Sequence, residues 1–238
     1  NGEFFGNLTS PFLKPTAISN AKNDRGVVYN QDQSIYNHFS ISTMGSCTQF
    51  PNPTEQNSSF SGSCSNGSLN RGVSIGGNGD FVRNTRRYYS LQTLENSETS
   101  GTLISNTWHC GGQDNSSMNT GMCRTSTSWT TSGNIQNFNI NNTVTSTNVG
   151  TLGVSFWNYV PTFISNNERN LVLMCGCNSG SYWHWSSYYR IGINSNSAQF
   201  GFLQGAANNC GSLDNGLGNR GIIYGVGVNP NWTPVNTI

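Results

Sequence analysis

The chain has 238 residues, a formal net charge of +1, and only 9% charged residues. This sparse, balanced charge excludes the clustered Lys and Arg with which nucleic-acid-binding surfaces displace counterions from phosphates. The sequence contains no apolar run of about 18 residues, so no membrane-spanning helix is predicted.

Asn, Ser, Thr and Gly supply most of the polarity, whereas the strong helix formers Ala, Leu, Glu and Lys are scarce. Thr, Val, Ile and aromatic residues suit strands, and Asn, Gly and Ser suit turns. Aromatic residues make up 11% of the chain, which argues against disorder. The composition therefore predicts a folded chain with little helix.

In chain order, residues 1–25 are expected to be irregular, and strands are expected over residues 26–30 and 35–43. Residues 44–80 are rich in turn residues and are interpreted as one long loop. Strands follow at 88–91 and 102–109, and then a polar loop over 110–123.

From about residue 126 the alternation of apolar and polar residues becomes clearer. Phe138, Ile140 and Val144 share one face at a period of two, and Ala198, Phe200 and Phe202 do the same further on. Further strands are expected within 151–160, 171–174 and 221–228. The pattern predicts an all-β fold, an antiparallel β-sandwich or flattened barrel with long loops closed by disulfides. We found no internal repeat and expect residues 1–238 to form one domain with a loop-rich N-terminal third.

The cysteines fall into short-range groups that favour disulfides. Cys47 with Cys64 and Cys110 with Cys123 bracket turn-rich segments, and Cys210 could pair with Cys175 or Cys177, leaving one thiol over. A zinc site is the weaker alternative, because no C-x-x-C pair is present. Disulfides indicate an oxidising compartment, so an extracellular, cell-surface or virion-surface location is expected.

Residues 181–194, SYWHWSSYYRIGIN, concentrate large side chains in one short run. If this run is a strand, Trp183, Trp185, Tyr189, Ile191 and Ile193 point to one side, toward the core. The opposite side then carries the predicted ligand-binding residues Tyr182, His184, Tyr188 and Arg190. Aromatic faces can pack on sugar C–H patches or in a protein interface, so the pattern does not choose between them. A bulge between Ser186 and Ser187 would shift the alternation, and a covering strand would bury the stripe.

Catalytic and metal patterns are weak. Ser74 lies in GVSIG, but no helix follows it, as a nucleophile elbow requires. No two carboxylates flank an aromatic cleft strand in the manner of a glycosidase. Asp and Asn in the Gly-rich segments 76–80, 111–115 and 212–219 could hold calcium, but they are interpreted first as turns. No cofactor and no catalysis are expected.

In its abundance of Asn, Ser, Thr and Gly, its few charges and its short-range cysteine pairs, the chain is similar to bacterial and viral receptor-binding domains. That resemblance is compositional and implies an attachment domain that binds a host glycan or glycoprotein, with multivalent display on a larger assembly. Two alternatives stay open: a β-sandwich enzyme acting on polysaccharides, and a structural subunit of a surface fibre or pilus.

Overall fold

The computed structural model describes residues 5–10, 16–20, 24–30, 35–50, 62–66, 70–76, 83–94, 98–107, 111–115, 119–125, 133–142, 144–151, 162–166, 170–175, 185–191, 196–202, 211–214, 220–224, 227–228 and 233–234. Regular structure in these residues consists of strands, and none of them lies in a helix. A helix long and apolar enough to cross a membrane is therefore not found among them.

The strands are consecutive and short. Their bounds are β1 Thr16–Asn20, β2 Arg25–Asn30, β3 Ile35–Ser40, β4 Thr48–Phe50, β5 Gly62–Asn66, β6 Arg71–Ile75, β7 Arg83–Ser90, β8 Glu98–Thr107, β9 Gly111–Asn115, β10 Thr120–Thr125, β11 Asn134–Asn139, β12 Thr147–Thr151, β13 Thr162–Asn166, β14 Leu171–Cys175, β15 Trp185–Arg190, β16 Ala198–Phe202, β17 Gly211–Asp214, β18 Gly221–Tyr224, β19 Gly227–Val228 and β20 Thr233–Pro234.

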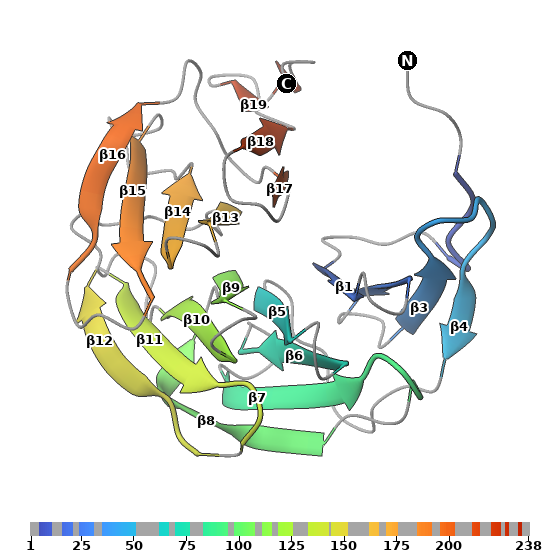
Figure 1. Cartoon of the computed structure of the whole chain (residues 1–238), viewed down its shortest axis with the longest axis horizontal. Helices are drawn as coiled ribbons and strands as arrows, with labels where there is room; N and C mark the ends of the chain where they lie inside the picture. The colour runs from blue at the N-terminus through green and yellow to red at the C-terminus, as the bar shows by residue number, and fades with distance from the viewer. Residues whose placement is uncertain are drawn as a thin grey trace.

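The strands form four antiparallel four-stranded sheets in chain order: β1–β4, β5–β8, β9–β12 and β13–β16, here called the first to fourth sheets. Two further pairs, β17–β18 and β19–β20, follow. Figure 1 shows the sheets side by side around a common centre, with the first strand of each innermost and the fourth outermost. The predicted all-β antiparallel chain is confirmed. The predicted sandwich or flattened barrel is not, since this radial arrangement is that of a β-propeller.

The sheets repeat one backbone feature that the sequence analysis missed. Asp24, Asn70, Asn119 and Asn170, each directly before the second strand of its sheet, adopt left-handed φ angles of 52°, 56°, 52° and 53°. Each of their carbonyls accepts a hydrogen bond from the amide that follows the third strand, at Ile41, Leu91, Ile140 and Ile191, over 2.7–3.1 Å. Asn and Asp tolerate this conformation better than other side chains. The expectation of no internal repeat is therefore wrong.

The repeat is also visible in the sequence once the turns are aligned. An Asn stands four residues before each turn Asn or Asp, at Asn20, Asn66, Asn115 and Asn166, and the pair recurs a fifth time as Asn215 and Asn219. Successive turn residues, from Asp24 to Asn219, lie 46 to 51 positions apart. Repeats of roughly 40–50 residues are typical of propeller blades. The pair β17–β18 is therefore the start of a fifth unit.

Two segments interpreted as loops contain strands, some of them inner ones. Residues 44–80 include β4, β5 and β6, and residues 110–123 include β9 and most of β10. Inner strands lie close to their neighbours, so small polar residues fit there: the hydroxyls of Ser63 and Ser65 donate to the carbonyls of Ala17 and Ser19, both over 3.0 Å. Val144 is also mispredicted. It is 65% exposed, because β11 ends at Asn139.

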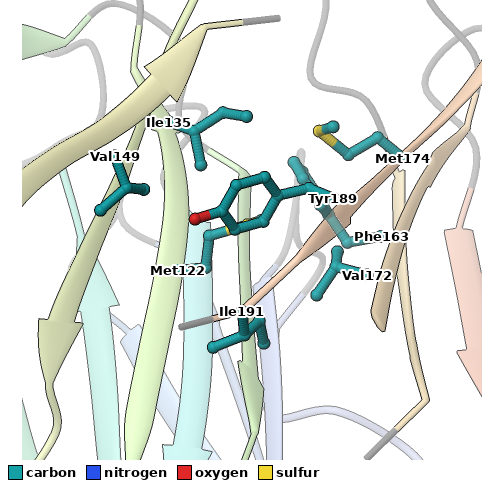
Figure 2. Close-up of a cluster of buried hydrophobic side chains, with 8 residues drawn as sticks. All are labelled: Met122, Ile135, Val149, Phe163, Val172, Met174, Tyr189 and Ile191. Atoms are coloured by element: carbon teal, nitrogen blue, oxygen red, sulfur yellow. The ribbon is translucent and has the colours of Figure 1, made fainter. Parts of the chain in front are cut away.

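The hydrophobic core is divided into clusters that lie between successive sheets. Ile18, Val27, Tyr29 and Tyr36 of the first sheet pack with Leu91, which follows β7 of the second. The second and third sheets share a cluster made of Cys64, Val73, Ile75, Leu103, Cys123, Phe138 and Ile140. The third and fourth share another, shown in Figure 2, made of Met122, Ile135, Val149, Phe163, Val172, Met174, Tyr189 and Ile191. Each sheet therefore depends on its neighbour for burial.

Two arginines join neighbouring sheets at equivalent positions. Arg25 opens β2 and donates to the carbonyl of Leu91 over 2.8 Å. Arg71 opens β6 and donates to the carbonyl of Ile140 over 3.0 Å, while its guanidinium lies 4.1 Å from the ring centroid of Tyr88. Leu91 and Ile140 occupy the same position in successive sheets. The arginine at the start of the second strand therefore holds the end of the next sheet's third strand.

We expect Arg71→Ala to lower the free energy of unfolding by about 2 kcal/mol, because a charged hydrogen bond and a cation–π contact are lost together. Chemical denaturation monitored by tryptophan fluorescence measures this change. Arg220→Ala serves as the matched control, because Arg220 holds the same position in the fifth unit but is exposed, and it should change stability by less than about 0.5 kcal/mol. Equal effects of the two variants would contradict the proposed role of Arg71.

Candidate functional site

The predicted ligand-binding stripe is partly visible. Tyr188 and Arg190 lie on β15, where Tyr188 is half-buried and Arg190 is exposed, while the intervening Tyr189 is 1% exposed. The predicted alternation is thus observed at this end of the strand. Tyr182 and His184 lie outside the described residues.

The pairing of β15 with β16 contains the register shift that the sequence analysis identified as a risk. Ser186 pairs with Gly201, but Ser187 pairs with Gln199. The extra residue is therefore Phe200 on β16, so the alternation along β15 is kept. Ser186 nevertheless points to the Tyr188 side and is buried, which shows that the exposed part of the stripe begins only at Tyr188.

Phe200 is the functional candidate that sequence reasoning missed. The alternation of residues placed it on one apolar face with Ala198 and Phe202, and it is 62% exposed. Its ring lies edge-on to that of Tyr188, with centroids 6.4 Å apart and planes at 80°. We call Tyr188, Arg190 and Phe200 the β15–β16 patch.

The third sheet has a bulge at the equivalent place, and there the extra residue is buried. Ile135 pairs with Gly150 and Gln136 with Asn148, which leaves Val149 as the extra residue. Val149 is 8% exposed and belongs to the cluster between the third and fourth sheets. The position of Phe200 is therefore one that a neighbouring sheet covers elsewhere in the molecule.

In the part of the chain that the structure describes, the fifth unit covers the inner part of the fourth sheet. The Ser212 hydroxyl of β17 donates to the carbonyl of Phe163 on β13 over 2.7 Å. A Cβ placed on Gly221 of β18 would lie 2.6 Å from Ile164 Cγ2, so β18 also lies against β13. Within the described residues, the fifth unit thus packs on the innermost strand and leaves the outer part of the sheet, with Phe200, exposed.

The patch combines an apolar ring, a phenol and a guanidinium. These side chains are enriched at the centres of protein interfaces, because they bury much area while keeping a polar group for hydrogen bonding.

Tyr189, on the opposite face, has a different role. Burial raises the pKa of its phenol, against a smaller lowering by the Asn137 amide, which donates to it over 3.4 Å. Its hydroxyl therefore stays neutral at physiological pH, and its ring belongs to the core.

The catalytic and calcium-binding candidates from the sequence lie within strands of the fold where the structure describes them. Ser74 lies inside β6, paired with Ser63 and Arg87, and not at a strand-to-helix turn. Of the calcium candidates, 111–115 forms β9 and 212–214 lies in β17, so these residues are strands and not turns. Among the described residues, no three His, Cys, Asp or Glu side chains gather as a metal site would require.

No predicted disulfide is observed at the four cysteines that the structure describes. Cys47, Cys64, Cys123 and Cys175 form none. The bridge from Cys47 to Cys64 is wrong because Cys64 is buried between the second and third sheets, whereas Cys47 is half-buried beside the N-terminal segment, where its amide donates to the Asn7 carbonyl. Cys110, Cys177 and Cys210 lie outside the described residues.

No protein-family model and no curated protein matches the sequence. Among solved structures, the fold is similar to a chain in a crystal structure of a nidogen–laminin complex. The TM-score is 0.61, the sequence identity is 6%, and the match covers 84% of this chain and 68% of that one. At this identity the likeness concerns the fold alone.

Proposed function

We propose that the chain is a non-catalytic extracellular attachment domain that binds a protein or glycoprotein receptor through the β15–β16 patch. The observation that carries this proposal is the exposure of Phe200 at a position where the third sheet buries Val149. Phe200 contacts Tyr188, and Arg190 is exposed two residues further along the same strand. Tyrosine and arginine are enriched among the residues that dominate binding energy in protein interfaces.

The chemistry of the patch favours a protein surface over a free sugar. Elsewhere in this chain, the equivalent face is covered by aliphatic and aromatic side chains of the next sheet. Tyr188 presents its ring edge-on to Phe200, so the two rings form an angled apolar surface and no flat platform for a sugar ring. The similar fold in a nidogen–laminin complex is in keeping with a protein partner, but it identifies none.

The test compares binding of Phe200→Ala and Ile104→Ala to intact epithelial cells and to a printed glycan array. Ile104 is the matched control, since it is 53% exposed on β8, an outer strand of the second sheet. We expect Phe200→Ala to weaken cell binding by about 30-fold, as loss of an interface hot spot does, and Ile104→Ala to have no effect.

Treating the cells with protease distinguishes the receptor classes. Loss of binding after proteolysis, with no signal on the array, supports a protein receptor. Array binding that survives Phe200→Ala, or equal cell binding by both variants, contradicts the proposal.

A further inference from the structure

Exposed apolar side chains gather beside the first sheet. Eight large hydrophobic side chains are exposed in the part of the chain that the structure describes, and half of them belong to this region: Phe5, Leu8, Ile41 and Met44. The ring of Phe5 lies edge-on to that of Phe39 on β3, with centroids 5.7 Å apart, and it remains 38% exposed. Apolar surface of this kind usually marks a place that a further group covers.

The segment that carries Phe5 also contains the N-glycosylation sequon Asn7-Leu8-Thr9. Five further N-x-S/T sequons begin at Asn57, Asn66, Asn115, Asn141 and Asn231.

The structure distinguishes Asn7 from the other sequons that it describes. Asn66 and Asn115 end inner strands, where each is paired with the second strand of its sheet. Asn141 is half-buried, whereas Asn7 is exposed, and the Asn7 side-chain amide makes no hydrogen bond to a described residue. Asn57 and Asn231 lie outside the described residues.

The backbone beside Asn7 is held in an extended conformation. The amide of Gly45 donates to the Phe5 carbonyl over 2.9 Å, and the amide of Cys47 donates to the Asn7 carbonyl over 2.8 Å. The two bonds lie two residues apart on both segments, as in paired extended chains. Side chains two residues apart in such a chain point to the same side. A sugar on Asn7 Nδ2 would therefore lie next to the ring of Phe5.

Thr9, the third residue of the sequon, fixes the far end of this segment. Its amide donates to Asn37 Oδ1 over 3.0 Å, and its hydroxyl donates to the same oxygen over 2.7 Å. Asn37 is fully buried on β3, so it is a rigid anchor. The folded chain thus holds Asn7 at a fixed place on the surface, between anchored neighbours on both sides.

We propose that Asn7 is an N-glycosylation site and that its first sugar packs on Phe5, so that the chain's own glycan covers part of the apolar region beside the first sheet. The apolar C–H groups of a sugar ring pack well on an aromatic face. This inference rests on the proposed function, because only a chain exported through a eukaryotic secretory pathway meets the transferase.

The modification is a group transfer from a lipid-linked oligosaccharide diphosphate. The Asn7 Nδ2 atom forms a bond to C1 of the first sugar, and the bond from C1 to the diphosphate oxygen breaks. The lipid diphosphate leaves with the electron pair of that bond, and one amide proton passes to a carboxylate of the transferase. The acceptor is the newly made chain, so the bond from Thr9 to Asn37 forms afterwards.

The glycan and the proposed receptor surface would not compete. Figure 1 shows β3 and β4 of the first sheet on the opposite side of the ring from β15 and β16. A glycan on Asn7, beside the first sheet, therefore leaves the β15–β16 patch open.

The first test is site-by-site peptide mapping of the full chain secreted from cultured mammalian cells, before and after treatment with peptide N-glycosidase. We expect a glycan on Asn7, which the enzyme removes while converting Asn7 to Asp. Asn7→Gln should lack this glycan. Asn141→Gln is the matched control and should keep it.

The second test concerns the packing on Phe5. The thermal midpoint of secreted Asn7→Gln should lie about 2–4 °C below that of the glycosylated chain. In a Phe5→Ala background the same substitution should change the midpoint by less than about 1 °C, because the sugar has lost the ring. An unmodified Asn7, or an equal loss in both backgrounds, would overturn the inference. Loss of cell binding by Phe200→Ala, measured in the Asn7→Gln chain, would still support the proposed function, so the two failures are distinguishable.

Discussion

Tyr189→Ala is expected to destabilise the protein by about 3–5 kcal/mol, the usual effect of deleting a large aromatic side chain from a core. Tyr189 lies in the cluster between the third and fourth sheets, and its ring reaches toward Met122, Ile135 and Val149 (Figure 2). Removing it opens a cavity in the cluster that the two sheets share. Urea denaturation followed by far-UV circular dichroism measures the change.

Tyr189→Phe is the matched control. It keeps the ring and removes the hydroxyl that accepts the long hydrogen bond from Asn137, so a loss below about 1 kcal/mol is expected. A Tyr189→Ala effect as small as that of Tyr189→Phe would show that the two sheets do not pack through this ring.

Asn170→Val is expected to cost about 2 kcal/mol, because a β-branched residue is forced into a left-handed conformation at φ 53°. The Asn170 carbonyl also accepts the amide of Ile191 over 2.7 Å, so strain there disturbs the end of the strand that carries the β15–β16 patch. The measurement is the midpoint of thermal unfolding, for which about 2–4 °C is expected per kcal/mol in a chain of this size.

Asn170→Gly separates backbone strain from loss of the side chain, since glycine adopts the left-handed region without steric penalty. It should leave the midpoint within about 2 °C of the unmodified protein. If Asn170→Gly destabilised as much as Asn170→Val, the side chain and not the φ angle would be the important feature.

Period-two alternation predicted many of the strands correctly. It identified β11 and β18, and short runs rich in apolar or aromatic residues identified β2, β3 and β14. Inner strands such as β5 and β9 were missed, since their neighbours approach closely and favour Gly and Ser, which alone are typical of turns. In this chain, small polar residues mark the most crowded part of the sheet.

The sequence analysis missed the internal repeat because the repeated units share a backbone conformation more than they share residues. The turn position keeps Asn or Asp, but the residues that follow it vary, as in DRGV, NTGM and NLVL at 24–27, 119–122 and 170–173. The shared left-handed φ angles and the bonds to Ile41, Leu91, Ile140 and Ile191 revealed the alignment. An aligned search for Asn-x-x-x-Asn/Asp would have found all five units.

The candidate site was half predictable. Alternation along β15 correctly separated Tyr188 and Arg190 from the buried Tyr189. Phe200 could not be found in this way, because a bulge breaks the period on which the argument depends. Its exposure points to a binding site only because Val149, the equivalent residue of the third sheet, is buried.

The proposed function depends most on Phe200 being a surface residue that a partner protein contacts. The direct test is to compare the thermal midpoints of Phe200→Ser and Val149→Ser, two bulge positions of opposite burial. We predict that Val149→Ser lowers the midpoint by about 4–8 °C, since it removes buried apolar contacts worth roughly 2 kcal/mol, and that Phe200→Ser changes it by less than about 2 °C. Equal destabilisation by the two variants would mean that the chain's own residues already bury Phe200, and the proposed binding surface would not exist.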